Sequence, residues 1–314
     1  KPDFTIIAGK KERKTMQREP LVPKALKEVL EYEQTEGVWL IDKLLPQYGV
    51  GILSGEAGTY KTWLLLSIAM AVAGGQSLFN EFPVNQGNVL MIDEENRIQL
   101  LSDRLKMLQS SKELPIYFMV KAGFNLSAGD GWIDVLKMHI ARYNIKFITL
   151  DSFVRMHDGE ENEARHVSDF FRKLGKVQKL GVTILMTHHH RKEMSGQPSR
   201  PSQALRGSSD IRAAVDTHIA VYSQNKGEIK VVQTKSRDAE AIDPFILKVE
   251  SEEERIQFVY SGEAQGTTKV EAKKKVVKLL TENSEMSRAD LVKAVKEVAG
   301  ANATGQAIKE LELD

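Results

Sequence analysis

The hydrophobic positions of this 314-residue chain fall into short apolar runs, separated by stretches in which apolar and polar residues mix. Buried strands are expected at the apolar runs, residues 49–53, 89–92, 115–120, 147–151 and 182–186. Helices are expected between these strands, at residues 63–73, 98–108, 132–143 and 163–180. Strands that alternate with helices imply an α/β fold with a mostly parallel sheet and right-handed crossovers.

The pattern changes towards the C-terminus. Short strands with turns between them are expected at residues 218–222, 228–234, 245–249 and 255–260, and they predict an antiparallel extension of the sheet. A polar stretch then precedes three short helical segments at residues 269–282, 288–298 and 303–312. These helices predict a small helix-turn-helix-like domain, winged-helix-like but without its wing. A helical oligomerisation cap is an equal alternative.

We therefore expect four parts in the chain: an N-terminal arm (1–36), an α/β domain (37–262), a linker (263–268) and a C-terminal helical domain (269–314). The arm is polar and mixed in charge, which suits a flexible leader or a segment that packs on a neighbouring subunit. A direct role of the arm in nucleic-acid binding is the weaker alternative.

Composition narrows the class of protein. The chain is 41% hydrophobic and 28% charged, and no apolar run reaches the length of a membrane span. It contains no cysteine, which excludes disulfides and cysteine-ligated metals, and its N-terminus lacks the apolar core of a signal peptide. We therefore expect a cytoplasmic protein without a membrane partner. The net charge is only +1, so any contact with nucleic acid must come from local basic segments.

The first expected strand runs into a glycine-containing turn that is followed by Lys61 and Thr62. A strand, such a turn and a helix form the context in which backbone N–H groups bind phosphate. Lys61 is expected to reach the β- and γ-phosphates of a nucleotide, and the Thr62 hydroxyl to bind Mg²⁺. The nucleotide-binding residues, called the phosphate loop below, are Gly55, Glu56, Ala57, Gly58, Thr59, Tyr60, Lys61 and Thr62.

One residue departs from the phosphate-binding pattern G-x-x-x-x-G-K-[ST], because Tyr60 replaces the second glycine. A residue just before a helix can adopt right-handed φ and ψ angles without being glycine. We therefore expect a right-handed conformation at Tyr60 and an intact loop. An ordinary glycine-rich turn into a core helix is the alternative.

Polar residues follow three further strands at the edge where open α/β sheets bind ligands. Glu94 or Glu95 can accept a proton from water that attacks the γ-phosphate, and Asp151 can hold Mg²⁺ through water. In a strand of period two, His188 and His190 share one side while His189 faces the other. One of these histidines can sense the γ-phosphate. Adjacent histidines cannot all converge on one ion, so a metal site here is disfavoured.

These motifs together resemble the RecA-like ATPases, in particular the AAA_25 or RepA-like group of hexameric replicative helicases carried by plasmids and phages. The resemblance rests on residues 55–62, 89–96 with Arg104-Leu105, 150–152 with Glu161-Asn162, and 185–192, and it covers about residues 37–260. It implies a RecA-like P-loop NTPase core in residues 37–262. It also selects Glu95 over Glu94 as the catalytic base, and His189 as the γ-phosphate sensor, with His188 as the alternative.

The resemblance implies a function for two basic segments. Lys235 and Arg237 resemble the Lys-x-Arg that related ring helicases insert into the ATP site of a neighbouring subunit. Arg206 and Arg212 are alternative candidates for such an inserted arginine, called a finger below. A run of charged residues that only faces solvent is the remaining alternative. The polar segment 190–201 is similar to the loops that grip single-stranded DNA in ring channels, with an ordinary surface loop as the alternative. The expected DNA-binding residues are Arg191, Lys192, Arg200 and Arg206.

The resemblance predicts a homo-oligomeric ATPase, in a hexameric ring, that uses ATP and Mg²⁺ and moves along single-stranded DNA. It would serve as a helicase or helicase-like replication factor of a plasmid, phage or other mobile element, with replication partners such as a primase or loader. Two alternatives stay open. The first is a KaiC-like or regulatory ATPase switch, and the second is a DNA-binding initiator or regulator without unwinding activity.

Overall fold

The computed structural model describes residues 23–31, 38–158, 164–190, 205, 209–225, 227–264, 268–282, 286–295 and 301–311. The chain divides into two compact units, Lys1–Glu36 and Gly37–Asp314. The described part of the first unit contains a short helix, α1 (Leu26–Leu30). Within the described residues, no helix has both the length and the apolar composition needed to cross a bilayer.

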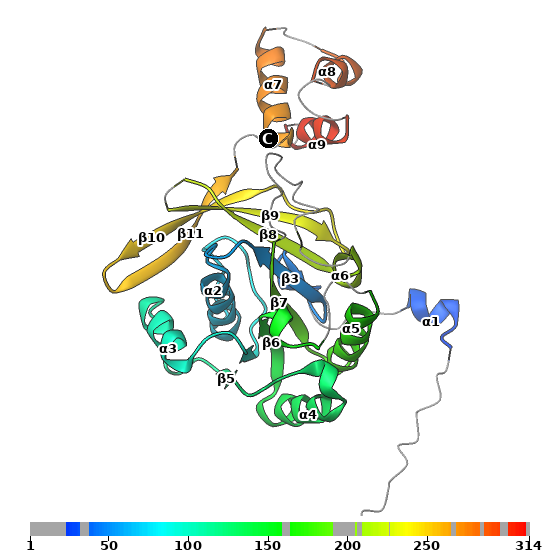
Figure 1. Ribbon diagram of the computed structural model, residues 1–314. Helices are drawn as coiled ribbons and strands as arrows, with labels where there is room; N and C mark the ends of the chain where they lie inside the picture. Colours follow the sequence, from blue (N-terminus) through cyan, green and yellow to red (C-terminus); the bar gives the residue numbers. More distant parts are fainter. Residues whose placement is uncertain are drawn as a thin grey trace, which may run out of the picture. The chain divides into compact units, whose positions relative to one another are not determined.

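A nine-stranded sheet organises the second unit (Figure 1). Its strands are β3 (Val50–Gly55), β4 (Asn88–Asp93), β5 (Ile116–Val120), β6 (Ile145–Asp151), β7 (Thr183–His189), β8 (Thr217–Ser223), β9 (Glu228–Ser236), β10 (Phe245–Glu252) and β11 (Arg255–Glu263). They lie in the order β11-β10-β9-β8-β3-β7-β6-β4-β5. The strands from β8 to β5 pair in parallel, and β8 to β11 pair in antiparallel fashion. The predicted parallel sheet with an antiparallel extension is confirmed.

Helices cover both faces of the parallel part of the sheet. Helix α2 (Lys61–Gly74) and helix α3 (Ile98–Met107) pack on the face that carries Leu53, and we call this the α2 face. Helices α4 (Gly131–Tyr143), α5 (Ala164–Gln178) and α6 (Ser209–Ala214) pack on the opposite face, which carries Ile52 and is called the α5 face. Alternate strand residues enter alternate cores, so each strand residue can be assigned to a face. A separate two-stranded sheet joins β1 (Trp39–Ile41) to β2 (Leu45–Pro46).

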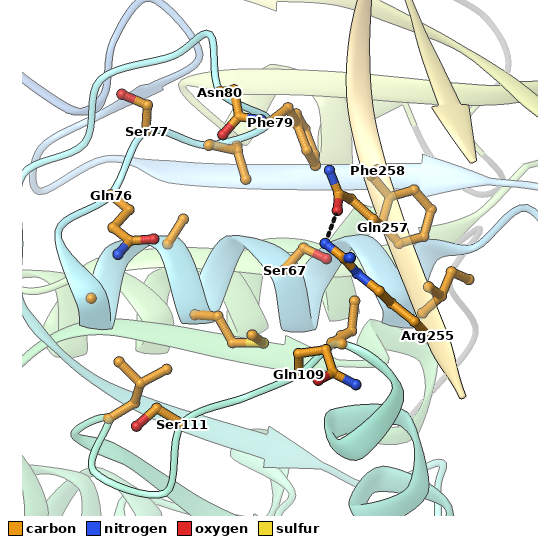
Figure 2. Close-up of a pocket in the computed structure, with 17 residues that line it drawn as sticks. Ser67, Gln76, Ser77, Phe79, Asn80, Gln109, Ser111, Arg255, Gln257 and Phe258 are labelled. Atoms are coloured by element: carbon orange, nitrogen blue, oxygen red, sulfur yellow. Dashed lines mark hydrogen bonds between the residues drawn. The ribbon is translucent and has the colours of Figure 1, made fainter. Parts of the chain in front are cut away.

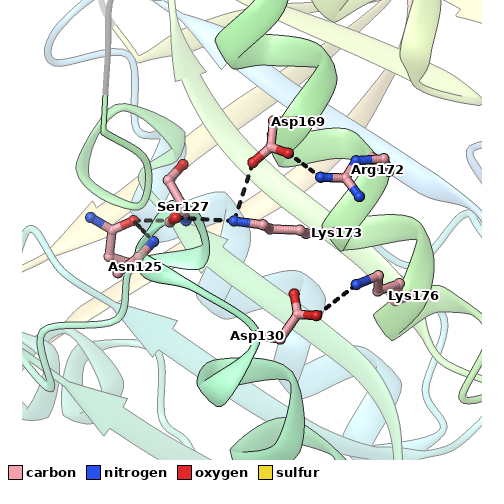
Figure 3. Close-up of polar contacts among 8 residues, drawn as sticks. Asn125, Ser127, Asp130, Asp169, Arg172, Lys173 and Lys176 are labelled. Carbon is pink, nitrogen blue, oxygen red and sulfur yellow. Dashed lines mark hydrogen bonds and ion pairs between the residues drawn. The ribbon is translucent and has the colours of Figure 1, made fainter.

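One hydrogen bond and one ion pair attach the loop between β5 and α4 to helix α5 (Figure 3). The Lys173 ammonium is buried, donates to the Ser127 carbonyl at 3.0 Å and pairs with Asp169 at 3.1 Å. Lys176 pairs with Asp130 at 2.8 Å at the start of α4. The short helix η1 (Leu126–Ala128) therefore lies fixed against α5, which holds the preceding residues of this loop beside the end of β4.

The C-terminal residues form three helices, α7 (Thr268–Glu282), α8 (Arg288–Val295) and α9 (Ala301–Leu311), with a core of their own. Ser287 caps α8, because its hydroxyl accepts from the Asp290 backbone N–H at 3.2 Å. The core residues are Ala272, Val276, Leu291, Val295, Ala307 and Ile308. Helices alone occur in the described part of this segment, and the winged-helix-like character and the domain boundaries stay predictions.

Candidate nucleotide site

The phosphate loop connects β3 to α2, and its lysine folds back over it. The Lys61 ammonium donates to the backbone carbonyls of Gly55 at 3.0 Å and Glu56 at 2.6 Å. Thr59 closes the turn by donating its hydroxyl to the same Glu56 carbonyl at 2.8 Å. Partial burial lowers the pKa of Lys61, and the nearby carboxylates of Asp151, Glu95 and Glu56 oppose that shift. The loop therefore holds a cation at the point where a helix begins.

Both glycines of the loop are required by its backbone. A Cβ atom on Gly55 would lie 2.4 Å from the Thr59 hydroxyl oxygen and 2.7 Å from a methyl carbon of Val221. Gly58 has open space around it, but its φ of 82° lies in the left-handed region. The first position excludes a side chain by contact and the second by backbone conformation.

The prediction of a right-handed backbone at Tyr60 was wrong. Tyr60 has φ 60° and ψ 15°, the left-handed conformation that the missing glycine would adopt without strain. Its carbonyl already accepts from the Leu64 N–H at 2.9 Å, so the chain must turn sharply into the first turn of α2 at this residue. The tyrosine ring packs edge-on against Phe258 of β11, with 5.8 Å between centroids. This contact offsets part of the cost of the unusual backbone.

Asp151 ends β6 and connects the loop helix to the sheet. Its carboxylate accepts from the Thr62 hydroxyl at 2.7 Å and from the Thr187 hydroxyl at 2.5 Å. Burial, then the neighbouring Asp93, raises the pKa of Asp151 to about 6. Thr62 and Asp151 supply the oxygen donors that Mg²⁺ prefers, so the two residues fit the predicted metal position. Among the described residues, no cluster of three or more histidine or carboxylate side chains could hold a metal alone.

Sequence reasoning did not single out Asp93, which lies in register with Asp151 on the adjacent strand. Asp93 accepts from the backbone N–H groups of Glu95 at 2.8 Å and Asn96 at 2.6 Å, and from the Asn96 amide at 2.9 Å. The Asn96 amide oxygen in turn lies 3.4 Å from Arg104. Asp93 therefore shapes the turn that presents Glu95. Its position at the end of an apolar strand, like that of Asp151, was the available signal.

The two adjacent glutamates have different environments. Glu94 accepts from the backbone N–H groups of Phe124 at 2.9 Å and Gly123 at 3.3 Å, so its carboxylate is used to hold the loop after β5. Glu95 is exposed, and its negative charge contributes to raising the pKa of Asp151. Glu95 is thus the glutamate that lies at the candidate site with its carboxylate exposed.

The three histidines alternate between the two faces of the sheet. His188 is buried on the α5 face with its ring 5.1 Å from that of Phe153, and the His190 ring lies 2.9 Å from the Ser54 hydroxyl. His189 is half-buried, points to the α2 face and is in register with Gly55, the first residue of the phosphate loop. Of the three, His189 is therefore on the same face as the helix that follows the loop.

The predicted finger residues contact helix α6 of their own chain. Lys235 donates to the carbonyls of Arg212 at 2.8 Å and Ala213 at 3.0 Å. Arg237 pairs with Asp216 at 2.9 Å and donates to the Ala213 carbonyl at 3.2 Å. Within the part of the chain that the structure describes, neither cation contacts the phosphate loop. The half-buried Arg212 donates to the Thr234 carbonyl at 2.8 Å.

The remaining predicted residues cannot be placed. Arg191, Lys192, Arg200 and Arg206, the expected DNA-binding residues, lie outside the described residues. Arg206, one of the two alternative finger residues, is among them.

A groove of about 590 Å³ lies along the second half of α2 (Figure 2). Arg255 of β11 enters this groove and donates to Gln257 at 2.6 Å. Phe258, the residue that contacts Tyr60, also lines it. None of the phosphate-loop residues lines the groove, so it is separate from the candidate nucleotide site.

The sheet order and the loop between β3 and α2 give this chain a RecA-like P-loop fold. A DnaB-like replicative helicase, described with its interactions with primase, has a similar fold, with a TM-score of 0.53 at 17% identity. The similarity covers 68% of this chain and 59% of the helicase chain, so this chain matches little more than half of that protein. A KaiC-like protein from Pyrococcus horikoshii OT3 matches with a TM-score of 0.47 at 17% identity, over 70% of this chain and 93% of the other.

The sequence also matches a family profile described as an AAA domain, AAA_25, over residues 17–195. This match spans more than half of the chain, and the chain belongs to this family. A comparison with curated proteins gave no sequence match.

Proposed function

We propose that this protein is an ATPase that binds Mg²⁺-ATP at the phosphate loop. The observation that carries the proposal is the hydrogen bond between Thr62 and Asp151, beside Lys61 and the exposed Glu95. The site thus contains the Lys61 cation, the two oxygen donors of Thr62 and Asp151, and the Glu95 carboxylate. They lie at the carboxyl edge of a parallel sheet, where such folds bind ligands. This is the minimum set for phosphoryl transfer to water.

Each residue would have a distinct role. The backbone N–H groups of Gly55, Glu56, Ala57, Gly58, Thr59 and Tyr60, with those at the start of α2, would surround the phosphates. Lys61 would leave its carbonyl partners and bind the β- and γ-phosphates, and Thr62 would bind the metal directly, with Asp151 holding it through water. Bound Mg²⁺ would neutralise charge that develops on the phosphate oxygens.

Glu95 would accept the proton of the attacking water. Its exposure suits this role in an open site, because a carboxylate that is not held by other donors can turn towards a nucleotide. His189 would donate a hydrogen bond to the γ-phosphate, which its register opposite Gly55 supports. Glu94 is the weaker candidate for the base, because its carboxylate already accepts hydrogen bonds from two backbone N–H groups.

We infer further that the active form is a homo-oligomer, most simply a hexameric ring, in which Lys235 and Arg237 act on the nucleotide of a neighbouring copy. The Arg237 side chain is 56% exposed, and neither residue contacts the phosphate loop of its own chain within the described residues. Arg212 is the weaker candidate, because its guanidinium is half-buried and donates to a strand carbonyl.

The fold similarity to a replicative helicase supports translocation on single-stranded DNA as the use of this ATPase, in a replication factor of a plasmid, phage or other mobile element. Arg191, Lys192, Arg200 and Arg206 would grip the DNA backbone in the ring channel, and a primase or loader would be a partner. The chain would then work in the cytoplasm.

The test is ATP turnover with and without single-stranded DNA, over protein concentrations that span assembly. We expect turnover that rises with both, and that is lost in Lys61→Ala and Glu95→Gln protein. Unchanged turnover in both variants would contradict the site assignment. ATP turnover that does not change with single-stranded DNA or with protein concentration would favour a regulatory nucleotide switch. Specific binding to duplex DNA that disappears when residues 268–314 are deleted would favour an initiator.

A further inference from the structure

A continuous series of hydrogen-bonded polar side chains, three buried and one half-buried, runs on the α5 face from the residue after β7 across β3 and β8 to β9. The Ser54 hydroxyl of β3 lies 2.9 Å from Nε2 of His190 and 2.7 Å from Nε2 of His218 of β8. On its other side, Nδ1 of His218 lies 2.5 Å from the Thr234 hydroxyl of β9. Ser54 and His218 have no exposed surface, and His190 is 8% exposed.

The hydrogen atoms available in this chain restrict it to two arrangements. The Ser54 hydroxyl has one hydrogen, so it can donate to one histidine ring and accept from the other; accepting from both rings would leave its buried hydrogen without an acceptor among these side chains, which is unfavourable. A neutral imidazole has one N–H, so the ring nitrogens of His218 must act as one donor and one acceptor. The tautomer of His190 therefore fixes the direction of the Ser54 hydroxyl, the tautomer of His218 and the direction of the Thr234 hydroxyl.

Both rings are neutral near pH 7. Burial first, then the charge of Lys61, lowers the pKa of His190 to about 4. Burial first, then neighbouring His190 and Arg212, lowers the pKa of His218 to about 3. Reversing the direction of one of these hydrogen bonds therefore requires reversing the others. A doubly protonated histidine could donate on both sides, but neither ring is in that charged form.

One end of the chain meets the phosphate loop. The His190 backbone N–H donates to the Gly55 carbonyl at 3.2 Å, and the Lys61 ammonium donates to the same carbonyl at 3.0 Å. His190 also follows His189 directly, the proposed contact of the γ-phosphate. Departure of Lys61 to a phosphate would change the partner of the carbonyl that holds His190.

The other end meets the segment that carries Lys235 and Arg237. The pairing of β8 with β9 shifts here, because His218 lies opposite Lys235 while Ile219 lies opposite Gln233. Thr234 is thus the extra residue of a β-bulge, a feature that turns the following side chains. Its hydroxyl contacts His218, and its carbonyl accepts from Arg212 at 2.8 Å.

We propose that His190, Ser54, His218 and Thr234 form a hydrogen-bond relay that couples the nucleotide state of the phosphate loop to the direction of Lys235 and Arg237. Ser54, His218 and Thr234 are positioning residues in it, and none of them needs to touch the nucleotide. The relay rests on the proposed function, since it needs a nucleotide at one end and a neighbouring copy at the other. Through this relay, the direction of Lys235 and Arg237 in one subunit would depend on whether nucleotide is bound at the phosphate loop of the same subunit.

The relay is tested directly by nitrogen NMR of the full chain with ¹⁵N-labelled histidine, assigned by single His→Gln variants. Spectra are recorded without nucleotide, with Mg²⁺-ADP and with a non-hydrolysable Mg²⁺-ATP analogue. We expect the His190 and His218 tautomers to change together on binding of the analogue. In Ser54→Ala protein the His218 response should be lost while nucleotide affinity stays within about twofold, since Ser54 faces away from the loop.

Thr149→Val is the matched control, because it removes a buried strand hydroxyl that has no partner in the described structure. It should leave both histidine responses intact. Normal nucleotide binding with an unchanging His218 signal, or an equal response in Ser54→Ala protein, would overturn the relay alone. Failure of the wild-type chain to bind nucleotide would instead overturn the proposed function as well.

A kinetic readout separates positioning from simple loss of stability. Thr234→Val protein should lose on the order of tenfold in kcat at assembling concentrations, with KM for ATP unchanged, because a misdirected finger acts on the transition state. Thr234→Ser keeps the hydroxyl and should restore kcat. Equal kcat in the valine and serine variants would show that the hydroxyl is not used.

Discussion

The Thr62 hydroxyl donates a 2.7 Å hydrogen bond to the Asp151 carboxylate, across 89 positions of the sequence. It joins the first turn of α2 to the end of β6. This bond, the one from Thr187 and a longer one of 3.4 Å from the Asn96 amide satisfy a carboxylate that is only 4% exposed. Thr62 and Asp151, the two residues proposed to hold Mg²⁺, are therefore already held together by a hydrogen bond.

Replacement of Thr62 by valine should weaken both stability and metal binding. The variant leaves a buried carboxylate short of one donor, which costs about 1–3 kcal/mol of the free energy of unfolding. Urea unfolding measures this loss, and titration with nucleotide at several Mg²⁺ concentrations measures the metal dependence. Thr62→Ser keeps the hydroxyl and serves as the control. Mg²⁺-dependent binding in the valine variant equal to wild type would rule out Thr62 as a metal ligand.

The left-handed Tyr60 predicts an unusual substitution pattern. Tyr60→Gly removes backbone strain of about 1–2 kcal/mol but also removes the ring contact with Phe258, so stability should change by less than about 1 kcal/mol. Tyr60→Ile keeps an apolar side chain but is β-branched, and should destabilise the loop and weaken nucleotide binding. Urea unfolding and nucleotide titration of the two variants decide this. Equal effects of Gly and Ile would contradict a left-handed Tyr60.

Alanine at the two loop glycines should have unequal effects. Gly55→Ala places a methyl group against Thr59 and Val221, so the loop must move and nucleotide affinity should fall at least tenfold, about 1.4 kcal/mol. Gly58→Ala meets no atom and carries only the cost of its positive φ, about 1 kcal/mol. Gly131→Ala, at an open helical position, is the control. The order of affinities is the measured outcome, and a reversed order would show that the loop is shaped differently.

The Arg237→Ala variant tests whether Arg237 acts on the nucleotide of a neighbouring subunit or is only a solvent-exposed charge. The Arg237 side chain is 56% exposed, and its partner Asp216, which is 16% exposed, keeps its hydrogen bond from the Val50 N–H, so loss of the ion pair should change the free energy of unfolding by about 1 kcal/mol or less. If Arg237 acts in a neighbouring site, turnover at assembling concentrations should fall by roughly 10³-fold or more. Arg255→Ala removes an exposed arginine of β11 and should leave turnover unchanged. Unaltered turnover in Arg237→Ala protein would assign the residue to the surface.

Acid should destabilise the folded chain through His218. Its folded pKa, about 3, lies below its ordinary value of 6.5, so the unfolded chain binds more protons between these values. The contribution of His218 to stability is present above pH 6.5 and is lost as the pH falls, by about 1.4 kcal/mol per unit between pH 6 and 4. Urea unfolding of wild type and His218→Gln protein over this range measures the difference. Parallel pH profiles would show that His218 titrates normally.

Much of the fold could be predicted because strands buried on both faces leave continuous apolar runs, such as residues 89–92 and 147–151. Polar residues at the ends of those runs likewise pointed to Asp151 and to Glu94 or Glu95, and the family resemblance chose Glu95. The conformation of Tyr60 could not be predicted, since it depends on Phe258, a residue that the sheet brings to it from far along the chain.

The hydrogen-bonded side chains that include Ser54 and His218 could not be predicted from the sequence, for a related reason. Each residue lies singly in an apolar strand and carries no local signal. The two meet across 164 positions only because β8 is placed next to β3, and strand order is a property of the whole sheet.

The position of β3 between β7 and β8 also governs when the nucleotide site can form during synthesis. The Val50 N–H finds its Asp216 partner 166 positions later, and Ser54 meets His190 after 136 positions. At ribosomal rates of about 5–20 residues per second, β3 waits roughly 10–30 seconds for its second neighbour. The strand that leads into the phosphate loop is among the first made, but it gains its second neighbour only when β8 has been made. The central strand of a nascent chain therefore keeps an open edge until the antiparallel part of the sheet begins to form.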